Sequence, residues 1–247
     1  MKVVIKDNFE LAGKFAAEII SETIRIKPAA VLGLATGSTP LGVYRELIRL
    51  HRESGLDFSG VTTFNLDEYA GIKPDDPASY RFFMEENFFR HINLKSKNTN
   101  VPDGLAADIP AFCREYEKKL ALCGGIDLQL LGLGANSHIA FNEPGSDFKS
   151  RTHLQKLDWK TIEDNSRFFG NNPGLVPGHA LTMGIGTIME AKKIILLASG
   201  RGKADAVKKS LEGPVTQGVP GSVLQQHPDA TFIIDREAAE KLGKAAK

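Results

Sequence analysis

Three residues within one short stretch of the chain have the chemistry of a proton-transfer site. The stretch LGLGANSHIAFNEPGSDF, residues 131–148, holds Asn136, His138 and Glu143 between glycines and a proline. Imidazole is the side chain that most often transfers protons near neutral pH. A glutamate five residues away can orient that imidazole and stabilise its charged form, as carboxylates do for catalytic histidines. A lone histidine is more often structural, so this hypothesis depends on what the fold brings beside it.

A metal site is the competing interpretation of the same stretch. His138 and Glu143 do not form an HExxH motif, and the other five histidines show no spacing typical of metal ligands. The two cysteines, Cys113 and Cys123, lie ten residues apart without a CxxC motif, which argues against zinc ribbons and disulfide scaffolds. We therefore expect no metal, and a reducing compartment fits the cysteine usage.

A second candidate for proton transfer follows a different apolar run. In VTTFNLDEYAG, Asp67 and Glu68 come directly after a predicted strand. Neighbouring residues of an extended chain point in opposite directions, so one acid is expected to face the site and the other to face away. A carboxylate held in a closed pocket has a raised pKa and can act as a general base. An ordinary turn or helix-capping aspartate is the alternative.

A third stretch has the composition of a phosphate-binding loop. In ATGSTPLGVY, the small residues Thr36, Gly37, Ser38 and Thr39 lead into a predicted helix, whose first N–H groups attract anions. No GK[ST] follows, so this is not a Walker A loop, and a tight turn with a helix cap uses the same residues. Lys203, after SGRG, can contact a phosphate as a point charge, although by itself it is equally typical of a solvated helix.

The remaining pattern predicts the framework that would bring these residues together. Apolar runs alternate with segments of helical spacing along almost the whole chain, which is typical of βαβ units and a mainly parallel, doubly wound, Rossmann-like α/β sheet in a single domain. Ligands bind at the carboxyl ends of such strands, where four polar segments follow apolar runs. Residues 144–180 are rich in Gly, Asn and Pro and are expected to be an irregular inserted lid. A final helix is expected over residues 237–246.

Composition narrows the class of protein. Of the 247 residues, 42% are hydrophobic and 25% charged, as in ordinary globular proteins. The formal net charge is +1, so bulk charge indicates neither nucleic acid nor an acidic membrane as a partner. The amino-terminal run is interrupted by Lys6 and Asp7, unlike a signal peptide, and no stretch approaches the ~20 apolar residues of a membrane span. We expect a cytoplasmic protein that acts on a small molecule.

Taken in order, the motifs resemble those of the glucosamine-6-phosphate deaminase family, also called glucosamine-6-phosphate isomerases. The resemblance covers essentially the whole chain and includes LGLATGSTPLGVY, TTFNLDEYAGI, DDPASYRFFMEENFF, GLGANSHIAFNEPGS, SRTH, NSRFF, ALTMGIGTI and SGRGKADAV. It implies conversion of glucosamine 6-phosphate and water to fructose 6-phosphate and ammonia, in amino-sugar catabolism. It also implies that neither a redox cofactor nor a catalytic metal is used.

The resemblance assigns roles residue by residue. The ring-opening histidine falls on His138, its supporting glutamate on Glu143, and the base that moves the C2 proton on Asp67. The phosphate loop falls on Thr36–Thr39, with Arg167 of NSRFF and Lys203 as its cationic partners. These assignments meet a chemical requirement, because opening a pyranose and moving a C2 proton need two separate proton-transfer groups.

Three positions depart from frequent family residues. Many members have an acid where this chain has Asn136, which can orient His138 by a hydrogen bond but supplies no charge. Ser38 and Ser137 stand where glycine is frequent, and each is expected to add a hydroxymethyl group near the site. His153 and Gln155 occupy a region where allosterically activated hexameric members have basic residues, so we expect no such activation here.

Three alternatives remain at this stage. The first is a galactosamine-6-phosphate deaminase, which differs only in the sugar epimer at C4. The second is a 6-phosphogluconolactonase, which hydrolyses a lactone without moving a C2 proton; the joint presence of LDEYAG and HIAFNEPG argues against it. The third is a sugar-phosphate sensor, which would need a DNA-binding segment and no intact acid–base set. The chain is expected to be a monomer or a homo-oligomer.

Overall fold

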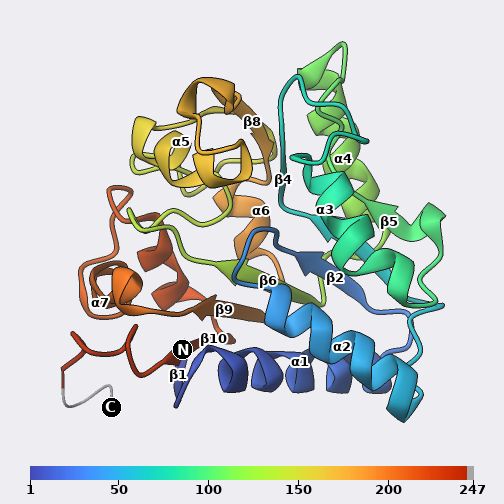
Figure 1. Cartoon of the computed structure of the whole chain (residues 1–247), viewed down its shortest axis with the longest axis horizontal. Coiled ribbons are helices and arrows are strands. Elements are labelled where there is room, and N and C mark those ends of the chain that lie inside the picture. The colour runs from blue at the N-terminus through green and yellow to red at the C-terminus, as the bar shows by residue number, and fades with distance from the viewer. Residues whose placement is uncertain (244–247) are drawn as a thin grey trace.

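The long apolar runs form one parallel sheet at the centre of the molecule. In the computed structural model, which describes residues 1–243, seven strands lie in the order β1-β10-β9-β6-β2-β3-β5, and every pairing between them is parallel. Their bounds are β1 Lys2–Lys6, β2 Val31–Leu34, β3 Thr62–Asn65, β5 Thr99–Asn100, β6 Leu128–Gly132, β9 Ile194–Ala198 and β10 Ala230–Asp235. The prediction of a mainly parallel α/β fold is confirmed (Figure 1).

The buried strands explain why this sheet could be predicted. All residues of β2, β9 and β10 are buried, because helices and loops cover both faces of the sheet. The helices are α1 Phe9–Ile26, α2 Leu41–Ser54, α3 Tyr80–Asn87, α4 Ile109–Leu122, α5 Trp159–Asn165, α6 Ile185–Met189 and α7 Ala204–Glu212. Side-chain caps fix several helix starts: Asn8 Oδ1 accepts from Leu11 N at 2.9 Å, and Asp108 Oδ1 accepts from Ala111 N at 2.9 Å. No helix in residues 1–243 is long and apolar enough to cross a membrane.

The strand order places a crevice between β2 and β6. From β2 the chain moves outward to β3 and β5, and then returns to add β6 on the opposite side of β2. At such a switch point the loops after the two neighbouring strands diverge and leave space at their carboxyl ends. The loops concerned are those that begin at Ala35 and Leu133, which carry two of the candidate motifs.

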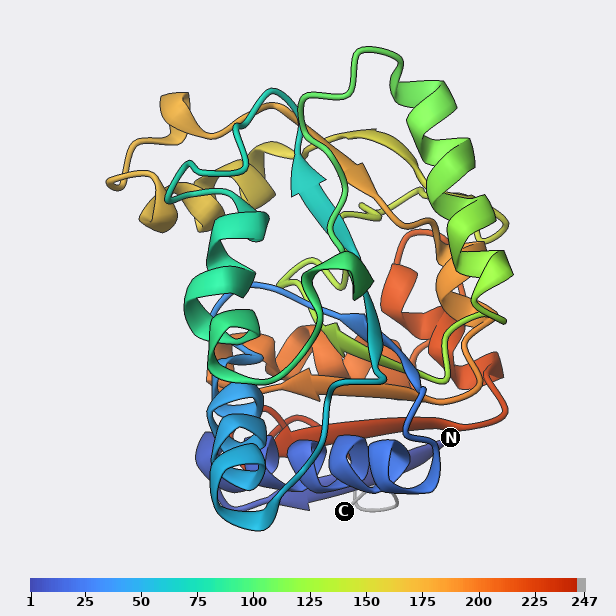
Figure 2. The ribbon, with the colours of Figure 1, turned by 90° about the vertical axis from the view of Figure 1, so that its right-hand side faces the viewer.

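A second sheet, which the sequence did not reveal, lies above the first. It contains β4 Asp67–Tyr69, β8 His179–Thr182 and β7 His153–Lys156 in the antiparallel order β4-β8-β7. In Figures 1 and 2 this sheet lies at the top of the molecule, while α1 and α2 lie at the bottom. The expectation that residues 144–180 are irregular is therefore wrong in part, because β7, α5 and the first residues of β8 fall within them.

The predicted final helix also needs correction. Residues 236–241 follow β10 as a series of turns rather than as a helix, and residues 244–246 of the prediction lie outside the described part of the chain. Asp235 explains the start of these turns, since its carboxylate accepts from Ala238 N at 2.8 Å and from Gly200 N at 3.1 Å. A side chain that bonds nearby backbone in this way competes with regular helix.

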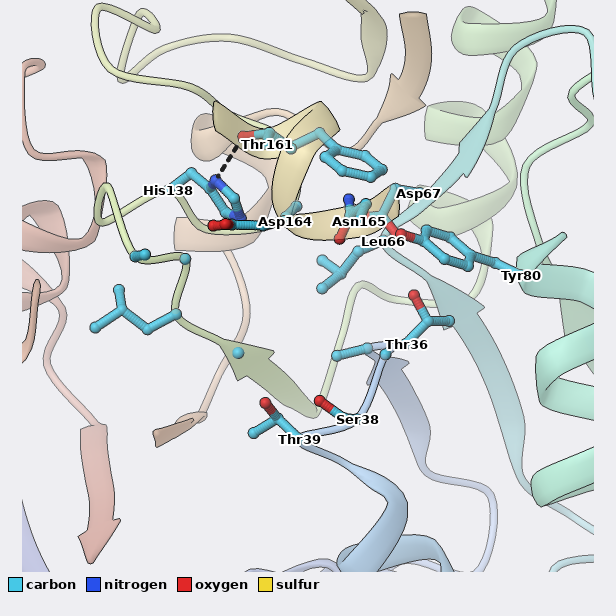
Figure 3. Close-up of a pocket in the computed structure, with 18 of the residues that line it drawn as sticks. Thr36, Ser38, Thr39, Leu66, Asp67, Tyr80, His138, Thr161, Asp164 and Asn165 are labelled. Carbon is cyan, nitrogen blue, oxygen red and sulfur yellow. Dashed lines mark hydrogen bonds between the residues drawn. The ribbon is translucent and has the colours of Figure 1, made fainter. Parts of the chain in front are cut away.

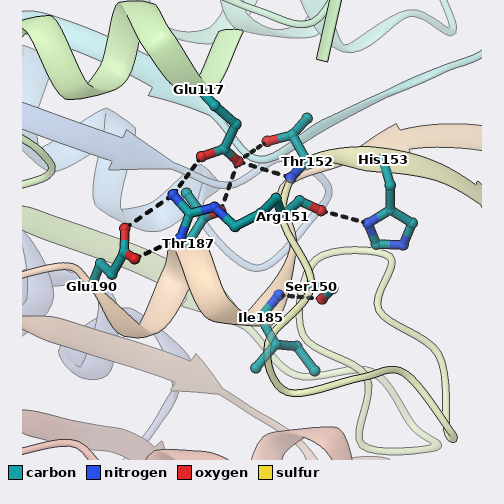
Figure 4. Close-up of polar contacts among 8 residues, drawn as sticks. All are labelled: Glu117, Ser150, Arg151, Thr152, His153, Ile185, Thr187 and Glu190. Carbon is teal, nitrogen blue, oxygen red and sulfur yellow. Dashed lines mark hydrogen bonds and ion pairs between the residues drawn. The ribbon is translucent and has the colours of Figure 1, made fainter. Parts of the chain in front are cut away.

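One half-buried glutamate, Glu117, ties the second sheet to the helices around it. Glu117 of α4 accepts from Thr152 N at 2.8 Å, from Thr152 Oγ1 at 2.5 Å and from Thr187 Oγ1 of α6 at 2.7 Å. Arg151 adds bonds to Glu117 and Glu190, as Figure 4 shows. Burial raises the pKa of Glu117, but these donors outweigh it and hold the pKa below its ordinary value. The segment that leads into β7 is thus held by one ionised carboxylate.

We predict that Glu117→Gln lowers the free energy of unfolding by about 2 kcal/mol, the scale of a buried hydrogen bond to a charged group. Glu115→Gln on the same helix is the matched control, because Glu115 is exposed and lies 3.7 Å from Lys118. Urea unfolding at pH 7 measures both changes. Equal stability of the two variants would show that the Glu117 cluster does not hold the second sheet.

Candidate active site

A pocket opens at the carboxyl ends of β2 and β6, at the switch point of the central sheet. Figure 3 shows that its wall is made by the loops after these strands, by the start of β4 and by α5 above them. The pocket is lined by Ala35, Thr36, Gly37, Ser38, Thr39, Leu66, Asp67, Tyr80, Gly132, Leu133, Gly134, Ala135, His138, Ala140, Phe141, Thr161, Asp164, Asn165, Arg167, Phe168 and Lys203. The structure therefore brings the three candidate motifs together, with Arg167 and Lys203 beside them.

The loop after β2 presents unused hydrogen-bond donors to the pocket. Gly37 has a φ of 88°, a left-handed conformation that glycine adopts without strain. Within residues 1–243, the backbone N–H groups of Gly37, Ser38 and Thr39 donate to no acceptor. Successive free N–H groups before a helix form a concave anion site. The hydroxyl groups of Thr36, Ser38 and Thr39 surround the same space.

Two cations complete this part of the pocket. Arg167, in the short helix Ser166–Phe168, donates from Nη2 to Ser38 Oγ at 3.4 Å. Lys203, just before α7, is half-buried and forms no ion pair within the described part of the chain. The pKa of Lys203 is lowered, mainly by burial. The negative charge of Asp164 raises this pKa, and the positive charge of Arg167 lowers it further. A half-buried cation that has no ion-pair partner strongly favours the binding of an anion.

Asp67 lies in the pocket with an unusual environment. Its side chain is buried, and among residues 1–243 no donor hydrogen-bonds its carboxylate. Burial, with a smaller contribution from the charge of Glu68, raises the pKa of Asp67 to about 8. The expectation for the LDEY stretch is met, since Asp67 lines the pocket whereas Glu68 points away to the first turn of α3. Such a carboxyl can exchange a proton near neutral pH.

The second candidate for proton transfer, His138, is held by a network of bonds. His138 Nδ1 lies 3.5 Å from Oε2 of Glu143, and that oxygen also accepts from Asn136 Nδ2 at 2.8 Å. The other oxygen of Glu143 accepts from the backbone N–H of Asp158 at 3.2 Å. Burial raises the pKa of Glu143, but the bonds from His138, Thr161 and Asn136 together hold it below its ordinary value. Asn136 therefore orients the glutamate, and its Oδ1 accepts from His138 N at 3.2 Å.

Local backbone geometry explains the sequence around this histidine. A side chain at Gly134 would place its Cβ 2.4 Å from the His138 ring, so only glycine leaves room for the imidazole. Ser137 has a φ of 70°, in the left-handed region that favours glycine. Ser137 is buried and does not line the pocket, so the expectation that it adds a hydroxymethyl group there is wrong. Ser38 does line the pocket, as expected.

The face of α5 that closes the pocket was not predicted from the sequence. Thr161, Asp164 and Asn165 all line it, and Thr161 Oγ1 lies 3.5 Å from His138 Nδ1 (Figure 3). Their i, i+3, i+4 spacing, two residues before Arg167, is a signal that would have found them. Tyr80 of α3 was also missed. Within residues 1–243 no group of three or more His, Cys, Asp or Glu residues could hold a metal ion.

Comparison with known proteins identifies the family to which the chain belongs. Residues 6–233 match the model of the glucosamine-6-phosphate isomerases/6-phosphogluconolactonase family. The chain belongs to this family. It is 54% identical to glucosamine-6-phosphate deaminase of Thermoanaerobacter pseudethanolicus, over 97% of this chain and 94% of the relative. It is 53% identical to glucosamine-6-phosphate deaminase 2 of Bacillus subtilis, over 100% of this chain and 99% of the relative.

Two solved structures have the same fold as this chain. A monomeric glucosamine-6-phosphate deaminase superposes with a TM-score of 0.95 at 51% identity, covering 97% of this chain and 99% of the other. A 6-phosphogluconolactonase from Trypanosoma cruzi superposes with a TM-score of 0.77 at 22% identity, over 98% of this chain and 96% of the other. The second likeness shows a shared fold alone.

The raised pKa of Asp67 leads to a prediction about stability. The folded protein keeps this proton up to about pH 8, whereas an unfolded aspartic acid releases it near pH 3.8. Between these values the folded state binds more protons, so Asp67 makes the protein less stable as pH rises. Asp67→Asn should therefore stabilise the protein more at pH 9 than at pH 5, by at most roughly 4 kcal/mol at 1.4 kcal/mol per pH unit. Urea unfolding of both proteins at the two pH values measures this, and an equal effect at both would contradict the buried, unpaired carboxyl.

Proposed function

We propose that the chain is a glucosamine-6-phosphate deaminase, which converts glucosamine 6-phosphate and water to fructose 6-phosphate and ammonia. The observation that carries this proposal is one pocket that joins an anion-binding loop to two separate proton-transfer groups, Asp67 and His138. Two relatives named glucosamine-6-phosphate deaminase are 54% and 53% identical to the chain along nearly its full length. Isomerisation of a phosphorylated amino sugar needs those three parts.

The proposed role of the phosphate site is to position the sugar. The loop Thr36–Thr39 supplies free N–H and hydroxyl groups, and Arg167 and Lys203 supply positive charge. Binding energy gained on the phosphate, which does not react, then holds the reacting carbons against Asp67 and His138. This distribution of roles accounts for a pocket in which two cations, Arg167 after α5 and Lys203 before α7, lie beside the loop after β2.

In the first chemical step, His138 opens the ring. The imidazole takes the proton of the C1 hydroxyl, the bond from C1 to the ring oxygen breaks, and the ring oxygen receives a proton. Nε2 of His138 has no partner among residues 1–243 and so is available to the substrate. Glu143 beside Nδ1 stabilises the imidazolium that forms between the two transfers.

In the second step, Asp67 moves the C2 proton of the open-chain aldehyde. The carboxylate takes this proton while the aldehyde oxygen gains one, which gives an enolamine. Return of the proton from Asp67 to C1 gives an iminium at C2, and addition of water there releases ammonia and leaves the ketone. A base with a pKa of about 8 suits both the uptake of the C2 proton and its delivery to C1, because near neutral pH neither protonation state is strongly favoured in free energy.

We also propose that residues 144–180 act as a lid. This segment contains α5 and the helix Ser166–Phe168, which bring Thr161 and Arg167 to the pocket. A lid that carries a phosphate ligand closes as the phosphate binds and excludes water from the reacting carbons. One chain supplies Asp67, His138, Arg167 and Lys203 to the pocket, and the phosphorylated substrate fits a cytoplasmic location.

Ammonia release from glucosamine 6-phosphate tests the activity. Galactosamine 6-phosphate and 6-phosphogluconolactone serve as parallel substrates, because they represent the two rival activities. The proposal requires ammonia and fructose 6-phosphate from the first substrate, and transfer of a deuterium label from C2 of that substrate to C1 of the product. Asp67→Asn should reduce this turnover by about 10²-fold. Preferential lactone hydrolysis without ammonia would overturn the assignment.

Lys203→Ala is predicted to raise the KM for glucosamine 6-phosphate by about ten- to a hundredfold, the range for one hydrogen bond to a charged group. Activity on unphosphorylated glucosamine should stay equally poor, since no phosphate is present to lose its partner. Lys208→Ala is the control, because Lys208 lies on α7 as an exposed lysine. If both variants bind the phosphorylated substrate as the parent does, Lys203 is not a phosphate ligand.

Thr161→Val is predicted to slow turnover of the cyclic sugar by about two- to tenfold, because it removes the hydroxyl beside His138 while keeping the shape. A 4,5-dideoxy analogue has neither hydroxyl that can close a furanose or pyranose ring and stays open, so its turnover should be unchanged. Thr161→Ser retains the hydroxyl and should restore the rate on the cyclic sugar. Equal losses on both substrates would place Thr161 outside the ring-opening step.

A further inference from the structure

A second carboxylate lies directly behind Asp67 and takes no part in the mechanism above. Glu68 is the next residue of β4, and its side chain points to the opposite side of the strand, where it is buried. Its Oε1 accepts from the backbone N–H groups of Tyr69 and Tyr80, each at 2.9 Å, and its Oε2 accepts from that of Arg81 at 2.9 Å. Both oxygens are therefore used as acceptors.

These bonds join the strand of the proposed base to one wall of the pocket. Tyr80 and Arg81 are the first two residues of α3, and their N–H groups have no partner within the helix. The ring of Tyr80 lines the pocket and stacks on Phe141 with centroids 6.0 Å apart at 13°. It also contacts the Tyr69 ring, with centroids 5.0 Å apart. Glu68 thus fixes the distance between this aromatic wall and Asp67.

The charged surroundings of the two acids differ. On its own side Glu68 meets Arg81 of α3 and Asp103, which line a small cavity with it. Asp67 faces Tyr80, His138, Asp164, Arg167 and Lys203 across the pocket. Burial raises the pKa of Glu68, and the three N–H groups and Arg81 oppose that rise. The negative charge of Glu68 adds to the effect of burial on the pKa of Asp67.

We propose that Glu68 is a positioning residue for the proton transfer at C2 and C1. It anchors the first turn of α3 and the Tyr80 wall to the strand that carries Asp67, and it keeps a negative charge behind that base. The charge makes Asp67 hold the proton taken from C2 until it is returned to C1. This inference rests on the proposed deaminase function.

The chemistry of the site requires glutamate at this position. Glutamine offers one acceptor oxygen, so its amide nitrogen would meet the N–H of Arg81, donor against donor. Aspartate keeps the charge but is one methylene shorter, so it cannot reach the N–H groups of α3 from the same backbone. Glu68→Asp therefore removes the anchoring and keeps the charge, whereas Glu68→Gln removes the charge together with the bond from Arg81 N–H.

The test compares Glu68→Gln, Glu68→Asp and the parent enzyme in kcat/KM for glucosamine 6-phosphate against pH. Glu68→Gln should move the midpoint of the acidic limb down by about one pH unit, because a like charge near Asp67 is lost. Glu68→Asp should reduce kcat without moving this midpoint. Glu85→Gln is the matched control, since Glu85 is a half-exposed acid on α3 that lies 3.4 Å from Arg81. A kcat/KM midpoint unchanged in Glu68→Gln would overturn the proposal.

A measurement on the unsubstituted enzyme tests the proposal even if the variants do not fold. Carbon-13 NMR titration of its side-chain carboxyl groups should show Glu68 ionised throughout the pH range in which Asp67 titrates. A protonated Glu68 in that range would overturn the proposal, because no charge would then stand behind the base. If the parent enzyme had no deaminase activity, the proposed function would be contradicted instead. The titration would still show whether Glu68 is ionised.

Discussion

The arrangement of the site depends on one residue, Leu66, that connects the two sheets. Leu66 donates from its backbone N–H to Leu34 O of β2 at 3.1 Å, and its own carbonyl accepts from Met183 N at 2.7 Å. The chain therefore passes from the central sheet into β4 without a loop, as Figure 2 shows. Asp67 follows at once and is held in register with Thr182 of β8. The bonds of Leu66 to both neighbours and the pairing of Asp67 with Thr182 therefore hold the start of β4 at the edge of the pocket.

Two buried carboxyl groups of the site, Asp67 and Glu143, have pKa values that their surroundings shift in opposite directions. Asp67 has no donor among residues 1–243, so burial dominates and raises the pKa of its carboxyl group to about 8. Glu143 is also buried, but its bonds from His138, Thr161 and Asn136 lower its pKa below the ordinary value. One carboxyl is thus suited to carry a proton and the other to remain charged beside an imidazole. Two acids with separated pKa values are what a site with two different proton transfers requires.

The sequence predicts those parts of the molecule that are specified by long local patterns. The strands of the central sheet are buried on both faces and appear as apolar runs, and the site residues follow their ends. The second sheet could not be predicted, because strands such as HLQK of β7 alternate between half-buried and exposed residues and contain no apolar run. The role of Ser137 was misjudged because backbone conformation, not pocket shape, governs that position. The helix expected after β10 failed because Asp235 bonds the turn instead.

On the proposed function, the segment from Asp158 to Arg167 links substrate binding to chemistry. At its start, the Asp158 N–H contacts Glu143 and the Thr161 hydroxyl lies beside His138. At its end, Arg167 contacts Ser38 of the phosphate loop. A phosphate that draws in Arg167 therefore also seats the groups that orient the ring-opening histidine. Binding energy from a non-reacting group is then used at the reacting carbon, which makes an unphosphorylated sugar a poor substrate in turnover as well as in binding.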